Sequence, residues 1–283
     1  MAASVIERFR ELVVDESDPF YFDHPLDHVP GMLLFSGMLD LAVRADAARS
    51  RGRRAGRVVA GLDFTRFCEL DRGTTLSCRP VPGRNRAWTV TARQGVREVC
   101  AGSIAFAEGA GVADGAAPAN GESRTGAPPG AARRPAAIPP SRHAPAPLVH
   151  RHRPENILVG EPVRHGRGTV EAAVLRRPGE EPDDWRPVRI VEAGRQFATM
   201  LEHSHHGRPM DARLLWVSLR MDVPFRLDRS VPLMLRWPVA RVAGPRSRCA
   251  VTLADASTGA GLGTLTYEAY AVDPERYERT RSS

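Results

Sequence analysis

The sequence is divided by one segment that cannot form a packed core. Residues 109–147 consist mostly of alanine, glycine and proline, and they contain no Phe, Trp or Tyr. A segment of this composition buries too little apolar area to offset the entropy of ordering it, so we predict a flexible linker. The prediction leaves two units, residues 1–108 and 148–283, and each is long enough to bury a core of its own.

The two units repeat one order of predicted elements. In the first unit an apolar segment predicts a helix over about 31–50, and alternating apolar and polar runs predict strands over 55–108. The second unit has a helical apolar spacing over about 188–206 and strand patterns over 210–275. A helix followed by antiparallel strands, present twice, predicts an α+β fold. We expect each sheet to wrap around its helix and the halves to join edge to edge, as a double hot-dog.

Composition excludes several classes of protein. With 42% hydrophobic and 26% charged residues, the chain is typical of a globular protein. It has no apolar run of about 18 residues and no signal-peptide pattern at its start, so we expect no membrane span and a cytoplasmic location. Its 4 cysteines are far apart and form no CxxC pair. This spacing argues against a zinc site and a disulfide framework, and it fits a reducing compartment.

The net charge of +7 does not by itself indicate nucleic acid. All 40 basic residues are arginine and lysine is absent, which indicates a genomic bias toward arginine codons. The arginines are scattered apart from one cluster over 44–57, and no helix-turn-helix pattern is visible. We therefore expect no nucleic-acid partner. An acidic carrier protein or a phosphorylated small molecule accounts for the excess charge equally well.

The segment "FDHPLDHVPG" places titratable groups directly before the first predicted helix. His24, Asp27 and His28 precede Gly31, which has no side chain to keep a ligand from the backbone at the helix start. In one interpretation these residues line a substrate cleft. In the other they form a rigid loop whose prolines fix φ and whose polar groups satisfy the free helix N–H groups. The sequence leaves both interpretations open.

The second predicted helix carries a polar cluster at helical spacing. Glu192, Arg195 and Gln196 lie three and four residues apart, so they share one face. The carboxylate could deprotonate or orient a hydroxyl for attack on a thioester, and the guanidinium could hold a phosphate or stabilise an oxyanion. The alternative is an ordinary ion pair on a solvated helix face. The nearby "HSHH" run (203–206) is better explained as a helix end than as a metal site, and we predict no metal or cofactor.

Four motifs give the chain a family resemblance. "FDHPLDHVPGMLL" (22–34) is similar to the D-H-P-x-D-H-x-P-G-M signature of the A-factor biosynthesis (AfsA-type) hot-dog family, which makes γ-butyrolactone signals in actinobacteria. "LVHRHRPENILVGEP" (148–162) resembles its V-H-R-x-x-P-E opening and "VEAGRQ" (191–196) its A-E-x-x-R-Q helix. "DFTRFCELDRGTTLSC" (63–78) resembles its strand pair. The matches cover most of both halves except the linker.

The chain departs from this family pattern in two ways. The family has the V-H-R half first, whereas here it is second; since the halves are pseudo-symmetric and the linker is long, the assembled sheet need not change. Ser36 and Leu39 stand where the family has glutamate and arginine, whereas Glu192 and Arg195 are retained in the second half. Hot-dog dehydratases also place a catalytic histidine where this chain has Phe22, so we do not expect dehydration by the first half.

The resemblance implies an acyltransferase that moves a β-ketoacyl group from an acyl carrier protein or acyl-CoA thioester to the hydroxyl of dihydroxyacetone phosphate or a similar phosphorylated triose. In this hypothesis Glu192 is the base or orienting group and Arg195 stabilises the phosphate or the oxyanion. The substrate-binding residues are predicted to be His24, Asp27, His28, Gly31 and Gln196.

A second hypothesis is a catalytically reduced hot-dog module that binds an acyl thioester or a protein partner without turnover. Ser36 and Leu39 favour it and the intact "VEAGRQ" opposes it. Whether the chain is an enzyme therefore stays open at this point. A homo-oligomer is compatible with either hypothesis.

Overall fold

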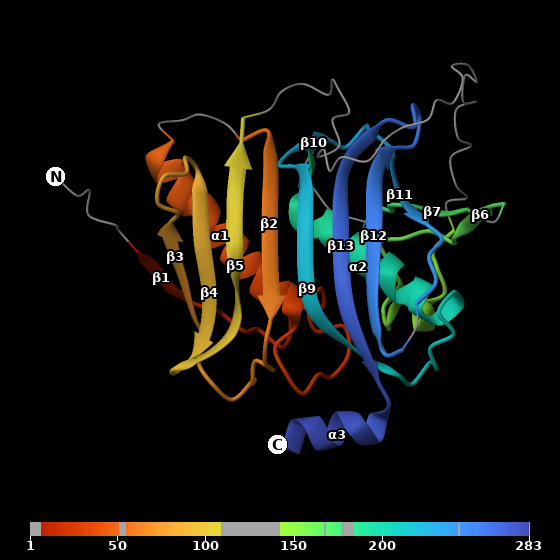
Figure 1. Cartoon of the computed structure of the whole chain (residues 1–283), viewed down its shortest axis with the longest axis horizontal. Coiled ribbons are helices and arrows are strands. Elements are labelled where there is room, and N and C mark those ends of the chain that lie inside the picture. Colours follow the sequence, from red (N-terminus) through yellow and green to blue (C-terminus); the bar gives the residue numbers. More distant parts are fainter. Residues whose placement is uncertain are drawn as a thin grey trace, which may run out of the picture.

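A single antiparallel sheet of 11 strands lies against two long helices (Figure 1). The computed structural model describes residues 7–50, 55–108, 142–166, 168–176, 184–242 and 244–282. The strand order is β1-β3-β4-β5-β2-β9-β13-β12-β11-β7-β6, and β8 and β10 form a separate pair.

Each half contributes one long helix and one continuous part of the sheet. The first half contains β1 (Arg8–Glu11), α1 (Gly31–Arg49), β2 (Arg57–Phe64), β3 (Thr75–Pro80), β4 (Ala87–Gln94) and β5 (Arg97–Ala107). The second half begins with the short helices η1 (Ala146–Val149) and η2 (Pro154–Asn156), then β6 (Val163–His165), β7 (Thr169–Ala173), β8 (Asp184–Trp185) and α2 (Pro187–Ser204). It continues with β9 (Arg213–Pro224), β10 (Leu227–Asp228), β11 (Leu233–Pro238), β12 (Arg246–Asp255), β13 (Gly261–Val272) and α3 (Pro274–Ser282).

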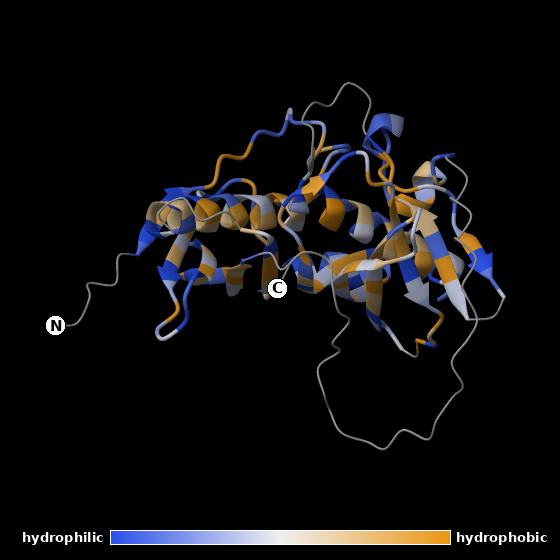
Figure 2. Ribbon diagram, turned by 90° about the horizontal axis from the view of Figure 1, so that it is seen from above, coloured by the Kyte–Doolittle hydropathy of each residue, from blue (hydrophilic) through white to orange (hydrophobic). Residues whose placement is uncertain are grey.

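The core lies between the sheet and the helix layer formed by α1 and α2 (Figure 2). Strand side chains alternate between the two faces, so that in β12 every second residue from Ser247 to Val251 is buried. Phe35 and Met38 of α1, and Ile190 and Phe197 of α2, are fully buried against this face. Burial of such side chains contributes about 1.5–3 kcal/mol each, which fixes both helices on the sheet.

The halves join through the pairing of β2 with β9. The register runs from Arg57 opposite Pro224 to Asp63 opposite Ser218. The Arg220 guanidinium donates to the Asp63 carboxylate across this junction at 2.6 Å. The sheet is therefore continuous, and the predicted double hot-dog fold is confirmed.

The two predicted helices agree with α1 and α2 within two residues at each end. Most of the predicted linker, residues 109–141, lies outside the described residues. Its last six residues are described, and there His143 forms a β-bridge with Gly160 and Ala144 is buried. Within the described residues, no helix has the length and hydropathy that crossing a membrane would require.

Candidate functional site

Two loops from different halves meet beside the start of α2. The α1 loop (residues 18–30) leads into α1, and the η1 loop (residues 150–157) follows η1. The buried Asp23 carboxylate accepts the backbone N–H groups of His152 and Arg153 and the side-chain amide of Asn156. Motifs far apart in the sequence are therefore joined at the seam between the halves.

Glu192 is the centre of a buried ionic cluster at this seam. Its side chain is fully buried, and its carboxylate accepts hydrogen bonds from Arg151 at 2.5 Å, Arg195 at 2.9 Å and Gln196 at 2.7 Å. Burial disfavours the charged form, but the charges of Arg151 and Arg195 outweigh it and lower the pKa of Glu192 to about 2. The carboxylate therefore stays ionised and fully engaged, and this face of α2 is buried rather than solvated.

Arg195 is the member of the cluster that reaches solvent. Its side chain is 23% exposed, and it grips Glu192 through two parallel hydrogen bonds of 2.9 Å. Burial opposes its charge, but the Glu192 carboxylate raises the pKa of Arg195. With Arg151 included, two guanidinium groups face one carboxylate, so the cluster keeps a net positive charge for an anionic ligand.

Gln196 connects α2 to the backbone of η2 and of the segment that follows it. It is fully buried, its carbonyl oxygen accepts the Leu158 N–H at 2.8 Å, and its amide donates to the Asn156 carbonyl at 2.7 Å. The same amide also donates to the Glu192 carboxylate at 2.7 Å, so both polar ends of the Gln196 side chain are engaged within the protein. This geometry favours a positioning role for Gln196 over contact with a substrate.

Four histidines from the two loops and α2 lie near Arg195 and one another. His150 stands in the left-handed region, with φ of 51°, and its Nε2 lies 2.8 Å from Nε2 of His203 on α2. The ring of His24, from the α1 loop, lies 4.9 Å from that of His152. Burial lowers the pKa of His150 to about 3, and the neighbouring Arg195 guanidinium acts in the same direction. His24 therefore lies close to His152 and within electrostatic range of His150.

Asp27 and His28 belong to a different contact, with the C-terminal helix α3. The Asp27 carboxylate accepts the Tyr277 hydroxyl at 2.7 Å and the His28 Nδ1–H at 2.6 Å. Burial opposes the charge of Asp27, but these two hydrogen bonds outweigh it and lower its pKa. Arg281 donates to the Asp27 carbonyl oxygen at 2.9 Å and pairs with Glu69. Helix α3 therefore holds the part of the α1 loop that was predicted to line a substrate cleft.

Gly31 allows α1 to approach the sheet closely. A Cβ atom at Gly31 would lie 2.8 Å from the indole of Trp216 on β9. Trp216 in turn stacks on Phe64 of β2, with ring centroids 5.0 Å apart, and on Tyr267 of β13, with ring centroids 5.7 Å apart. The glycine thus serves the packing of α1 on an aromatic row that crosses the junction between the halves.

The equivalent position in the first half has no such cluster. Ser36 forms a side-chain hydrogen bond with Tyr21, and Leu39 is buried in the core. Asp40 is partly exposed and pairs with Arg44 at 3.0 Å. The buried combination of carboxylate and guanidinium is therefore present in only one of the two pseudo-equivalent places that the structure describes.

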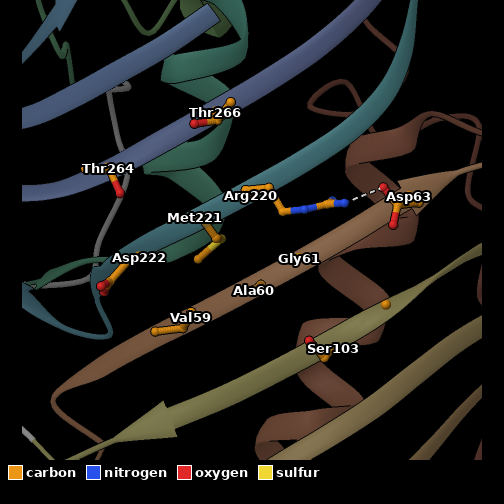
Figure 3. Close-up of a pocket in the computed structure, with 11 residues that line it drawn as sticks. Val59, Ala60, Gly61, Asp63, Ser103, Arg220, Met221, Asp222, Thr264 and Thr266 are labelled. Atoms are coloured by element: carbon orange, nitrogen blue, oxygen red, sulfur yellow. Dashed lines mark hydrogen bonds and ion pairs between the residues drawn. The ribbon is translucent and has the colours of Figure 1, made fainter. Parts of the chain in front are cut away.

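A shallow groove lies on the opposite face of the sheet, away from α1 and α2 (Figure 3). It has a volume of about 530 Å³, and small residues such as Gly61, Ser103 and Thr264 line it. Arg220 and Asp63 at its edge pair with each other, so they offer little charge for a ligand. Among the described residues, no group of three or more His, Cys, Asp and Glu side chains is placed to hold a metal ion.

Sequence analysis missed several residues of the site. Arg151 and His150 lie in the "VHR" run that supported the resemblance, but their partners on α2 are 41 and 53 residues away in the chain. Asp23 adjoins the predicted His24, and its partners lie in the other half. No local pattern gives these pairings, although the "VHR" run marked the right segment.

Comparisons with solved structures agree with this fold. The dehydratase domain of PpsC from Mycobacterium tuberculosis in complex with C12:1-CoA has a TM-score of 0.58, 18% identity and 94% coverage of both chains. The tesB protein of Mycobacterium avium subs paratuberculosis has a TM-score of 0.55 and 17% identity, covering 88% of this chain and 89% of that one. The dehydratase domain from the CurJ module of curacin polyketide synthase has a TM-score of 0.59 and 12% identity, covering 97% of this chain and 94% of that one. At these identities the likeness shows the fold alone.

Sequence comparison identifies the family. A stretch of 72 residues is 39% identical to the 2-oxo-3-(phosphooxy)propyl 3-oxoalkanoate synthase of Streptomyces virginiae, covering 25% of this chain and 23% of that enzyme. Residues 8–107 and 133–272 match the A-factor biosynthesis hotdog domain, so the match spans both halves and most of the chain. The chain therefore belongs to the A-factor biosynthesis hotdog family.

Proposed function

We propose that the protein transfers a β-ketoacyl group from an acyl carrier protein or acyl-CoA thioester to the hydroxyl of a dihydroxyacetone-phosphate-like acceptor, as a cytoplasmic step of γ-butyrolactone-type biosynthesis. The observation that carries the proposal is the buried cluster of Arg151, Glu192 and Arg195 at the seam between the halves. The name of the Streptomyces virginiae relative describes an ester of a 3-oxoalkanoate with a phosphorylated triose, which supports this substrate pair.

The geometry divides the roles of the cluster. Glu192 is already ionised and saturated with donors, so it orients Arg195 rather than taking a proton. The Glu192 carboxylate holds the guanidinium of Arg195, and the side chain of Arg195 is partly exposed to solvent. Arg195 can therefore bind the acceptor phosphate or the oxyanion of the tetrahedral intermediate. Because the arginine is fixed before the substrate arrives, little reorganisation is required in the transition state.

The reaction balances without a cofactor. The acceptor hydroxyl oxygen forms a bond to the thioester carbonyl carbon, the C–S bond breaks, and the hydroxyl proton ends on the departing thiol. In this proposal the exchange takes place beside His24 and the η1 loop, where the rings of His24 and His152 lie 4.9 Å apart.

The test is an assay with purified protein, a β-ketoacyl thioester and dihydroxyacetone phosphate, read by mass spectrometry of the ester product. We expect product with the wild type, and with Arg195→Lys a loss of about 10²–10³-fold in kcat, because an ammonium cannot reproduce the two-point grip on Glu192. Arg248→Lys, at an exposed position on β12, is the control and should keep full activity. Turnover by Arg195→Lys at the wild-type rate would contradict the assignment.

A second candidate is a module that binds an acyl thioester without turnover. The observation that favours it is the engagement of the Glu192 carboxylate, which leaves the cluster without a free carboxylate base. Calorimetric binding of the thioester by wild-type protein, with no ester formed from any hydroxyl acceptor, would establish this candidate in place of the transferase.

A further inference from the structure

The proposed transfer needs a group that takes the proton of the acceptor hydroxyl. Glu192 cannot supply it, since Arg151, Arg195 and Gln196 already occupy its carboxylate. The group must therefore come from the side chains that border Arg195.

His150 has an unusual backbone conformation for such a position. Its φ of 51° lies in the left-handed region, and Arg86 is the other non-glycine residue with positive φ within the described residues. Non-glycine residues seldom adopt this conformation, and where they do, the surrounding structure enforces it. Here the N–H groups of His150 and Arg151 donate to the carbonyls of Pro147 and Ala146, which close the turn. The same turn directs Arg151 to Glu192 and His150 to His203.

The hydrogen bonds of His203 determine which nitrogen of His150 is free. His203 Nδ1 lies 3.1 Å from the Arg208 carbonyl oxygen, which can only accept, so Nδ1 of His203 carries the proton. In the neutral ring Nε2 of His203 is then an acceptor, and His150 donates to it from its own Nε2 at 2.8 Å. The lone pair of His150 therefore lies on Nδ1, and none of the hydrogen bonds described for the chain occupies it.

The charges around His150 come from three elements. Burial disfavours a proton on His150, and so do the guanidinium groups of Arg195 on α2 and Arg213 on β9. His203 on α2 and His24 on the α1 loop would act in the same direction if they were protonated. The imidazole is consequently neutral at the start of the reaction. An acceptor phosphate, or the oxyanion that forms as the hydroxyl attacks, offsets these positive charges, so the proton affinity of His150 rises as the reaction proceeds.

We propose that His150 is the general base of the acyl transfer and that His203 is the positioning residue that fixes its tautomer; this inference rests on the proposed function. Nδ1 of His150 takes the proton of the acceptor hydroxyl while the oxygen attacks the thioester carbonyl. The tetrahedral intermediate collapses with loss of the thiolate, and the His150 imidazolium returns the proton to the thiolate sulfur. The ring ends in its starting state.

The backbone of His150 permits a test that protects the fold. His150→Gly removes the imidazole and suits a left-handed position, so the variant should fold. We expect kcat to fall about 10²–10⁴-fold with KM little changed, and added imidazole to restore part of the rate. His165→Ala removes an exposed histidine on β6 and should keep wild-type kcat.

A spectroscopic measurement tests the tautomer independently of turnover. In ¹⁵N-edited NMR spectra of the full chain with labelled histidine, we expect His150 to carry its proton on Nε2. His203→Leu removes the acceptor, so it should give a mixture of tautomers and lower kcat rather than raise KM.

The outcomes separate the two proposals. If the wild type transfers acyl groups and His150→Gly keeps its rate, or loses it without rescue by imidazole, the base assignment is wrong while the proposed function stands. A proton on Nδ1 of His150 in the wild type also overturns the assignment. If the wild type forms no ester at all, the proposed function is wrong and the inference falls with it.

Discussion

Replacement of Glu192 tests whether the buried cluster is ionic in the way the structure describes. The pKa of Glu192 in the folded protein is about 2, below its ordinary value of 4.5, so the ionised carboxylate stabilises the folded state. At about 1.4 kcal/mol for each pH unit, the ionised carboxylate contributes about 3 kcal/mol at pH 7. Removal of one partner from a buried ion pair typically costs about 3–5 kcal/mol, which agrees with this figure. We therefore expect Glu192→Gln to lower the free energy of unfolding by about 3 kcal/mol at pH 7.

The sign of the pH dependence follows from the lowered pKa. The folded state holds Glu192 ionised down to about pH 2, whereas the unfolded chain takes up the proton near pH 4.5. The contribution is therefore complete above about pH 4.5 and disappears as the pH falls toward 2. The wild type should lose stability more steeply than Glu192→Gln across this window, so the difference between the two should shrink in acid.

Urea unfolding followed by circular dichroism at pH 7 and at several values down to pH 3 measures both effects. Glu275→Gln is the matched control, because Glu275 is 88% exposed and pairs with Arg279 at 3.7 Å. Exposed pairs of this kind contribute about 0.5 kcal/mol or less. A loss below about 1 kcal/mol for Glu192→Gln at pH 7, or a difference from wild type that stays constant in acid, would refute the ionic description.

Three other predictions follow from the same contacts. The acid limb of the kcat/KM profile should lie well below pH 6.5, the ordinary pKa of histidine, because burial lowers the pKa of His150 in the free enzyme to about 3. An acid limb near pH 6.5 would contradict this. Tyr277→Phe should speed amide exchange across residues 22–30 and Arg279→Ala should not, as measured by mass spectrometry; equal exchange in both variants would show that α3 does not hold the loop. Gly31→Ala should cost about 1–3 kcal/mol in urea unfolding, because its Cβ would meet Trp216; wild-type stability would mean that the indole moves aside without strain.

The fold could be predicted from local patterns because α2 and most of the strands are amphipathic and α1 is apolar over most of its length. Pro30 precedes α1 and Pro187 begins α2, and the apolar spacing after each proline continues to the observed ends. Helix α3 was not predicted, since its sequence "PERYERTRS" is short and strongly charged. Its contact with the α1 loop joins Tyr277 to a residue 250 positions earlier, which no local pattern reveals.

The candidate site could be predicted in part for the same reason. Glu192, Arg195 and Gln196 do share a helix face, since helical spacing alone determines this. The environment of that face could not be predicted, because Arg151, which makes it a buried cluster, comes from another loop. Likewise the "DHPLDH" segment divides in space: His24 lies at the seam, whereas Asp27 and His28 turn to α3.

The arrangement explains why one site can depend on both halves although a single half holds its charged cluster. Arg151 reaches Glu192 from a loop whose backbone is tied to Asp23 of the other half, and its guanidinium also donates to the Phe20 carbonyl. The first half therefore fixes the position of the η1 loop. This role requires hydrogen-bond acceptors in the first half but no catalytic group. Ser36 of the first half forms a neutral hydrogen bond with Tyr21 and does not belong to the charged cluster. On this argument, the first half contributes to the site by fixing the position of the η1 loop, and the second half contributes the charged cluster.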